Sequence, residues 1–246
     1  MIKEFKKDKL IVKAYENRAI MGAEAARHAV TTIQALLQTQ PQVNIIFAAA
    51  PSQNEFLEAL IQAPLEWGRI NAFHMDEYIG LPDDAPQRFA SFLRNAIFSK
   101  LPFRSVHYMQ TECKPYSDLL KQYPVDITCM GIGENGHLAF NDPPVADFND
   151  PVLVKKVQLD ETCRQQQVND GCFKQLSDVP THAITLTIPA LMAAPHIFCM
   201  VPGPTKATAV YNTIHHGIDE SVPATILRRH NNAILFIDNL SGSMLS

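Results

Sequence analysis

The chain has 246 residues, of which 46% are hydrophobic and 19% charged, a composition typical of a globular protein with a sizeable core. Its formal net charge is -4 at pH 7 and its Lys and Arg residues form no long run, so we expect no binding to nucleic acid. No stretch approaches the roughly 20 apolar residues that span a membrane, and the first residues carry no signal-peptide pattern. We therefore expect no membrane partner and a cytoplasmic location.

The cysteines and histidines indicate neither disulfides nor a metal site. The five cysteines are an odd number without a C-x-x-C pair, so we expect reduced thiols. The nine histidines include the adjacent His215 and His216, but no H-E-x-x-H motif and no pair at i,i+4 spacing. No metal is therefore predicted.

Six short runs of apolar and β-branched residues predict β-strands, and helix-like segments lie between many of them. Most runs are almost continuously apolar, which is typical of strands covered on both faces. The pattern predicts an α/β fold, a Rossmann-like three-layer α/β/α sandwich with a mostly parallel central sheet. The predicted strands cover residues 43–50, 70–75, 125–132, 182–188, 196–201 and 233–238.

Three segments have the pattern of helices that pack on this sheet. The first, 17–37, places its apolar residues largely on one helical stripe. The others are 88–101 and 204–216, the last with Pro204 well placed for a first turn. The polar stretch 160–180 is interpreted as an insertion or lid. No composition break marks a second domain, so we expect one domain over all 246 residues.

Four loops are expected at the carboxyl ends of the parallel strands, where open α/β sheets bind their ligands. They are APSQNE after the run from Val43, MDEYIGLPDD after the run from Ile70, GENGHLAFNDPP after the run from Val125 and PGPTK after the run from His196. We therefore expect the chemistry of the protein to lie on these loops.

The third loop, with the residues just before it, contains Gly131-x-Gly133-x-x-Gly136, the glycine spacing of a dinucleotide-binding turn. Such a turn needs a long helix after the third glycine, and the prolines at 143, 144 and 151 prevent one here. A nucleotide cofactor is therefore disfavoured, and no cofactor is predicted.

The same glycines permit a tight loop that presents Asn135, His137, Asn141 and Asp142 at a strand end. A histidine beside a carboxylate can carry protons at neutral pH, with the carboxylate fixing its tautomer. The alternative is a surface histidine in a glycine-rich turn.

Asp76 and Glu77 directly follow the second predicted strand. A carboxylate there can act as a general base, although capping the next turn is the more frequent role of an isolated Asp. A carboxylate and a histidine on separate strand-end loops are the minimum equipment for moving protons on and off a small molecule. No G-x-S-x-G motif is present, which disfavours a serine hydrolase of the α/β-hydrolase kind.

The other two loops carry groups suited to an anion. Ser52 and Glu55 have capping-box spacing at the start of a helix, where unsatisfied N–H groups attract phosphate. A well-capped helix explains the spacing equally. Lys206 lies near the start of another helix, where it can add a point charge for a phosphate or be an ordinary solvated lysine.

With these residues assembled, the chain resembles the glucosamine-6-phosphate deaminase/isomerase family, which shares its fold with 6-phosphogluconolactonases. The resemblance covers about residues 40–238 in the same loop order. It rests on FHMDEYIGLP, similar to an Asp-Glu-Tyr segment, on GIGENGHLAFNDP, similar to a Gly-His loop, and on VPGPTKATAV, similar to a lysine-bearing phosphate loop.

The resemblance implies an aldose–ketose isomerisation of a 2-amino-2-deoxy sugar phosphate followed by loss of ammonia, without an organic cofactor. Asp76 matches the general base that moves a proton from C2 to C1. His137 matches the histidine that assists opening of the sugar ring, and Asp142 takes the place of the acid that supports it, usually Glu.

The resemblance also implies a set of substrate-binding residues. Lys206 matches a phosphate ligand, and Ser52 and Gln53 fall where the phosphate-binding turn lies. Arg164 corresponds approximately to an arginine of the mobile segment that covers substrate. The predicted set is Ser52, Gln53, Glu77, Gly136, Arg164 and Lys206.

Three departures from the family pattern bear on the substrate. Asn135 stands where the deaminases carry Asp, and related isomerases acting on the galacto epimer can have Asn there. The AAPSQN turn has no glycine, and the chain ends at Ser246, earlier than the allosteric hexameric members, so we predict no effector site.

Glucosamine 6-phosphate is the expected substrate. The alternatives are galactosamine 6-phosphate, a 6-phosphogluconolactonase activity and a non-catalytic sugar-phosphate-binding protein, and a homo-oligomer is compatible with the resemblance.

Overall fold

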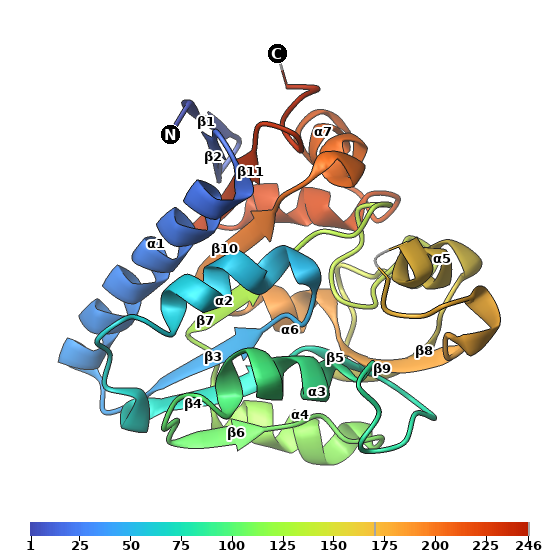
Figure 1. The fold of residues 1–246 in the computed structure, drawn as a ribbon, viewed down its shortest axis with the longest axis horizontal. Coiled ribbons are helices and arrows are strands. Elements are labelled where there is room, and N and C mark those ends of the chain that lie inside the picture. The colour runs from blue at the N-terminus through green and yellow to red at the C-terminus, as the bar shows by residue number, and fades with distance from the viewer. Residues whose placement is uncertain (170, 246) are drawn as a thin grey trace.

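An eight-stranded sheet forms the centre of the computed structural model, which describes residues 1–169 and 171–245 (Figure 1). The strand order is β1-β2-β11-β10-β7-β3-β4-β6. β1 and β2 are antiparallel and every other neighbouring pair is parallel, which confirms the mostly parallel central sheet. The strands are β1 (Lys3–Lys7), β2 (Leu10–Tyr15), β3 (Val43–Phe47), β4 (Ile70–His74), β6 (Ser105–His107), β7 (Ile127–Met130), β10 (His196–Val201) and β11 (Ala233–Asp238).

Helices cover both faces of this sheet and give the three-layer α/β/α arrangement (Figure 1). Strand residues alternate between the two apolar layers, so that Ile45 and Phe47 pack in the first layer and Ile46 in the second. The first layer includes α1 (Arg18–Thr39), α2 (Asn54–Leu60) and α3 (Phe89–Leu93), and the second includes α4 (Cys113–Gln122), α6 (Ile188–Met192) and α7 (Ala207–His215).

The long helix α1 confirms the helix predicted over 17–37. Asn17 caps it, since its side chain accepts the N–H of Ile20 at 2.9 Å. Its buried stripe packs on the sheet and on α2. Gly22 lies in this stripe, and an added Cβ there would be 2.5 Å from the Cβ of Glu55. Glycine therefore allows α1 and α2 to pack in close contact.

A second, three-stranded antiparallel sheet lies beside the first in the order β5-β9-β8. It comprises β5 (Asp76–Tyr78), β9 (His182–Leu186) and β8 (Val154–Gln158). The run 182–188 therefore forms a strand as predicted, but its assignment to the central parallel sheet is wrong, and MDEYIGLPDD begins with a strand where a loop was expected. An apolar run indicates burial and does not identify the strand with which it pairs.

Two local predictions differ from the structure. The segment 88–101 forms α3 and then a π-helical turn, Arg94–Phe98, in place of one regular helix. The capping box at Ser52 is also wrong, because Ser52 lies in a 3-10 turn and accepts a hydrogen bond from Gln53, while Glu55 pairs with Arg18. Glu55 is thus paired with a residue distant in the sequence, and no described side chain caps the start of α2.

The polar stretch 160–180 contains α5 (Glu161–Asn169) and a 3-10 turn, Leu176–Asp178.

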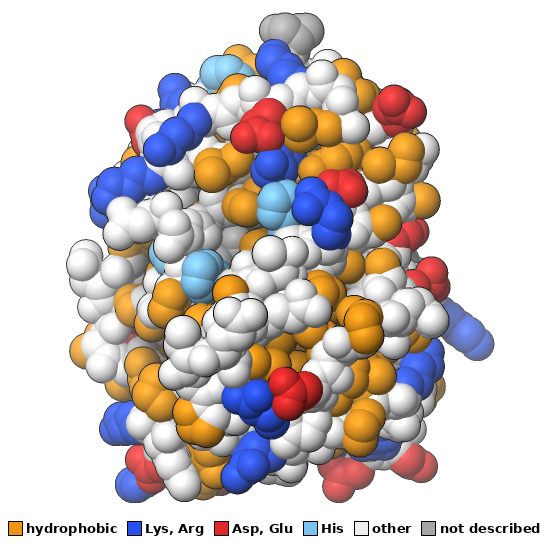
Figure 2. Space-filling view, turned by 90° about the vertical axis from the view of Figure 1, so that its left-hand side faces the viewer, with side chains coloured by type: hydrophobic (Ala, Val, Ile, Leu, Met, Phe, Trp, Pro, Cys, Tyr) orange, Lys and Arg blue, Asp and Glu red, His pale blue; other side chains and the backbone are white. Residues whose placement is uncertain are grey.

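Among the described residues, no helix combines the length and apolar character needed to cross a membrane. The face in Figure 2 carries acidic and basic side chains interspersed among apolar and uncharged ones. That face therefore lacks the basic stripe typical of nucleic-acid-binding surfaces.

Candidate active site

A cavity of about 500 Å³ lies at the carboxyl ends of β3, β4, β7 and β10. Each of the four predicted loops contributes to its lining, as expected for an open parallel sheet. Further walls come from residues 86–92 and from the polar stretch 160–180. These loops and the residues just before them contribute 48–52, 75–76, 131–140 in part and 202–206.

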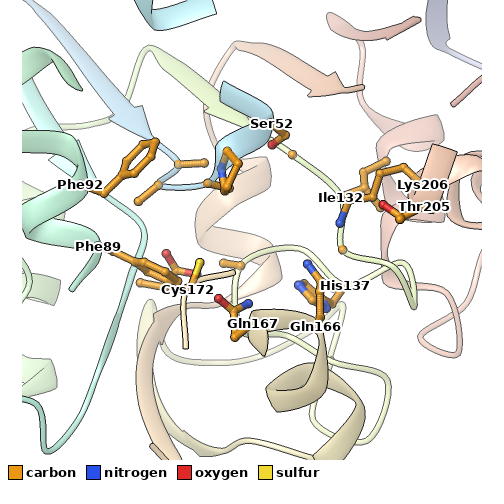
Figure 3. Close-up of a pocket in the computed structure, with 18 of the residues that line it drawn as sticks. Ser52, Phe89, Phe92, Ile132, His137, Gln166, Gln167, Cys172, Thr205 and Lys206 are labelled. Atoms are coloured by element: carbon orange, nitrogen blue, oxygen red, sulfur yellow. The ribbon is translucent and has the colours of Figure 1, made fainter. Parts of the chain in front are cut away.

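The cavity has a polar end and an apolar end (Figure 3). Lys206 and Thr205 lie on one side, and Phe89 and Phe92 lie on the opposite side. His137 lies between these two ends with its ring directed into the cavity. The arrangement suits a ligand with one anionic end.

Asp76 is the first residue of β5 and lines the cavity with only 7% of its surface exposed. Burial, and then the negative charges of Glu77 and Asp142, raise the pKa of Asp76 well above its usual value. The antiparallel pairing of Asp76 with Thr185 of β9 fixes its backbone. Asp76 is therefore a carboxyl group that is held in place and whose raised pKa makes its carboxylate a stronger base.

His137 is held by an amide and a carboxylate. Its Nδ1 lies 2.8 Å from Oδ1 of Asn135 and 3.0 Å from Oδ1 of Asp142. Because both oxygens accept, we assign the proton of the neutral imidazole to Nδ1, which leaves the lone pair on Nε2. Nδ2 of Asn135 also donates to Asp142 at 2.9 Å, so the three side chains form a closed hydrogen-bonded triangle.

The glycines of the third loop make room for this triangle. An added Cβ at Gly133 would lie 2.1 to 2.3 Å from three atoms of the His137 ring. At Gly136 the backbone has φ +87°, and an added Cβ would be 2.9 Å from Val222. The dinucleotide-like spacing therefore serves the placement of His137.

A buried thiol that the sequence reasoning missed completes the cluster. Cys163 of α5 donates a hydrogen bond to Asp142. Burial alone would raise the pKa of Asp142, but His137 and the hydrogen bonds from His137, Asn135 and Cys163 outweigh it and hold that pKa below its usual value. The carboxylate is therefore anionic beside the histidine.

The ligand atoms of His137, Asp142 and Cys163 lie within 4.8 Å of one another, the spacing of a metal site. Burial, and then the charge of Asp142, raise the pKa of the Cys163 thiol, so it keeps its proton at neutral pH. The thiol donates a hydrogen bond to Asp142, whose carboxylate also accepts from His137. The donor set therefore fits a hydrogen-bonded cluster better than a metal centre.

Glu77, predicted to bind substrate, lies outside the cavity lining. Its carboxylate accepts the backbone N–H groups of Tyr78, Phe89 and Ala90, each at 3.0 Å, and Nε of Arg88 at 3.3 Å. These bonds join β5 to the first turn of α3. Glu77 therefore positions the strand that begins with Asp76.

Three other predicted substrate-binding residues also lie outside the lining. The amide of Gln53 donates to Oγ of Ser52 and to the carbonyls at the ends of β7 and β10. Arg164 donates to the carbonyls of Leu176 and Val179, within the stretch 160–180. The backbone of Gly136 accepts an N–H from residue 224. The structure thus brings Ser52, Asp76, His137 and Lys206 to the cavity, with Asn135 and Asp142 behind His137.

Several lining residues were missed by the sequence reasoning. Gln166 and Gln167 lie on one turn of α5, and their place was hidden within a stretch notable only for its polarity. Arg18 opens α1, more than thirty residues before Ser52, and no motif marks it. Only the folded chain brings these side chains to the cavity.

Comparison with known proteins shows the family to which the chain belongs. The model of the family described as glucosamine-6-phosphate isomerases/6-phosphogluconolactonase matches residues 16–236. The chain belongs to this family. Two relatives named glucosamine-6-phosphate deaminase, from Bacillus thuringiensis (strain Al Hakam) and Bacillus cereus (strain AH820), are each 32% identical to it over 244 residues. Each alignment covers 96% of this chain and 88% of the relative.

Solved structures of this family share the fold. One described as a monomeric glucosamine-6-phosphate deaminase is 25% identical with a TM-score of 0.86, and the match covers 95% of this chain and 99% of that one. The 6-phosphogluconolactonase of Thermotoga maritima is 20% identical with a TM-score of 0.76, over 94% of this chain and 100% of its own. At that identity the second likeness concerns the fold alone.

Proposed function

We propose that the protein is a glucosamine-6-phosphate deaminase, which converts glucosamine 6-phosphate to fructose 6-phosphate and ammonia. The observation that carries this proposal is that Asp76 and His137 line one cavity together with Ser52 and Lys206. A base, a proton carrier and groups for a phosphate are what the isomerisation of a sugar phosphate requires. The relatives named glucosamine-6-phosphate deaminase support an amino sugar as the substrate.

His137 opens the sugar ring. With its proton on Nδ1, its Nε2 accepts the proton of the C1 hydroxyl and returns it to the ring oxygen as the bond from C1 to that oxygen breaks. The neighbouring Asp142 carboxylate and the Asn135 amide oxygen hold the tautomer and stabilise the imidazolium that forms in passing. The open-chain aldehyde with its amine at C2 is the product of this step.

Asp76 carries out the isomerisation. Its carboxylate takes the proton from C2 while the carbonyl oxygen at C1 gains a proton from solvent, which gives an enolamine. Asp76 then delivers its proton to C1, which leaves an iminium ion at C2. Water adds to this carbon, a proton returns to solvent and ammonia departs, leaving the C2 ketone of fructose 6-phosphate. The raised pKa of Asp76 brings its basicity closer to what the abstraction of a carbon-bound proton demands.

The phosphate of the substrate occupies the polar end of the cavity. The buried Lys206 supplies a positive charge, and the hydroxyls of Ser52 and Thr205 lie in the same lining. Binding energy from this remote dianion positions C1 and C2 against the reacting side chains.

The stretch 160–180 covers the bound substrate as a lid, within one catalytic domain. Gln166, Gln167 and Cys172 from this stretch line the cavity. The backbone N–H of Glu134 donates to Oε1 of Gln166 at 2.9 Å, which links α5 to the loop that carries His137. The cytoplasmic location and a homo-oligomeric state stay predictions from the sequence.

A second candidate substrate is galactosamine 6-phosphate, and the feature that favours it is the amide of Asn135 beside His137. The lactonase alternative is less favoured, because the relatives that align with 96% of this chain are named glucosamine-6-phosphate deaminase.

The test is to incubate the purified protein separately with glucosamine 6-phosphate, galactosamine 6-phosphate and 6-phosphogluconolactone. We expect equal amounts of ammonia and ketose phosphate from an amino-sugar phosphate. Consumption of the lactone alone would identify a lactonase. Binding of an amino-sugar phosphate without product would identify a non-catalytic binding protein.

A further inference from the structure

The turn that carries Ser52 offers few side-chain donors to a phosphate. The segment 48–53 contains no glycine and one hydroxyl, that of Ser52. The side-chain amide of Gln53 has two N–H groups and three acceptors nearby, at 2.9 Å and twice at 3.4 Å. Those N–H groups are already engaged, so Gln53 holds the turn in place without a donor for the ligand.

Arg18 lines the same cavity as this turn. Its Nε donates to Oε1 of Glu55 at 2.5 Å, and its Nη2 donates to Oε2 of Glu55 at 2.8 Å and to the carbonyl of Pro51 at 2.9 Å. The two bonds to Glu55 use the edge formed by Nε and Nη2, and the bond to Pro51 uses the second N–H of Nη2. The two N–H groups on Nη1 donate to none of the described residues, and the side chain is 43% exposed.

Close helix packing holds this arginine in place. Gly22 lies one helical turn after Arg18, on the same side of α1. An added Cβ at Gly22 would lie 2.5 Å from Cβ and 2.7 Å from the carbonyl carbon of Glu55. The contact brings the start of α1 against the start of α2, where the bidentate ion pair fixes the plane of the guanidinium. A preorganised side chain loses less freedom when it binds an anion.

We propose that Arg18 binds the phosphate of the substrate through Nη1, alongside Lys206 and Ser52. This inference rests on the proposed phosphorylated substrate. The free Nη1 group can donate a directed, charge-assisted hydrogen bond to a phosphate oxygen, and the guanidinium stays charged at every working pH. The inference extends the phosphate site from the two loops found by sequence reasoning to the first helix of the chain.

The experiment measures the affinity for glucitol 6-phosphate, which has no carbonyl group and cannot be turned over, by calorimetric titration. Arg18→Met removes the donors, and we expect its dissociation constant to rise about 10- to 100-fold. Arg18→Met with Glu55→Met removes both charges of the ion pair and is expected to show the same loss. The matched control is Arg27→Met, which removes another arginine of α1, 60% exposed and paired with Glu24. It should bind as the wild type does.

The outcomes separate the explanations. Wild-type affinity in Arg18→Met would overturn the inference and leave the proposed function intact. Wild-type affinity in the double variant would also overturn the inference. In that case the weaker binding of Arg18→Met would come from the unpaired charge of Glu55 and not from the lost donors of Arg18. A wild-type protein that binds glucitol 6-phosphate no better than glucitol would contradict the phosphorylated substrate as well. Arg18-dependent binding without ammonia release would support this inference and reject the deaminase.

Discussion

Replacing Glu77 by Gln tests whether this residue supports the site or binds substrate. Each carboxylate oxygen of Glu77 accepts two hydrogen bonds, from four buried or partly buried donors at 3.0 to 3.3 Å. The amide of Gln keeps one oxygen and turns an NH2 group toward the other two donors. Two buried donors left unsatisfied cost about 1–3 kcal/mol each, so we expect the free energy of unfolding to fall by about 2–6 kcal/mol.

Urea unfolding followed by the fluorescence of the single tryptophan, the buried Trp67, measures this loss. The matched control is Glu66→Gln, whose side chain is 67% exposed and pairs with Arg69. We expect that variant to stay within about 0.5 kcal/mol of the wild type. The reasoning is refuted if Glu77→Gln unfolds at the wild-type urea concentration while its KM for glucosamine 6-phosphate rises, because that result assigns Glu77 to the substrate.

Three further predictions concern the cavity. Gly133→Ala should lower kcat at least about 100-fold, because its Cβ would displace the His137 ring, while Gly68→Ala, whose Cβ meets nothing within 4 Å, should keep full activity. Lys206→Ala should raise KM more than it lowers kcat in steady-state assays, and an unchanged KM would contradict its phosphate role. The pKa of Asp76 is higher in the folded protein than in the unfolded chain, where it is about 3.9. As the pH rises above that value, ionisation of Asp76 therefore lowers the free energy of unfolding. Asp76→Asn should therefore be more stable than the wild type at pH 7, by a margin that shrinks toward pH 4 in urea titrations, and a constant margin would argue against the buried charge.

The parallel core of the fold could be predicted because its strands are short, apolar and separated by helix-like segments. The strand 182–188 was placed in the wrong sheet because local pattern does not encode its pairing with β5 and β8. The strands β1 and β2 were not predicted from the sequence. β1 is largely exposed and rich in charged residues, so its hydrophobic pattern is weak.

The candidate site was predictable where one loop holds several of its residues, as in the cluster around His137. The structural roles of Glu77 and Arg164 could not be predicted from the sequence. Both carry charge at positions that suggest ligand binding, yet Arg164 donates to backbone carbonyls, and Glu77 accepts three backbone N–H groups and the side chain of Arg88. Cys163 and Arg18 act through contacts with distant segments, and no spacing in the sequence indicates either contact.

The most direct test of the central claim uses glucosamine 6-phosphate that carries deuterium at C2, with the wild type and Asp76→Asn side by side. The account predicts ammonia release by the wild type, slower than with the unlabelled sugar because the bond to C2 breaks, and a fall of at least about 100-fold in Asp76→Asn. Wild-type turnover in Asp76→Asn, or no ammonia from the wild-type protein with either epimer, would contradict it.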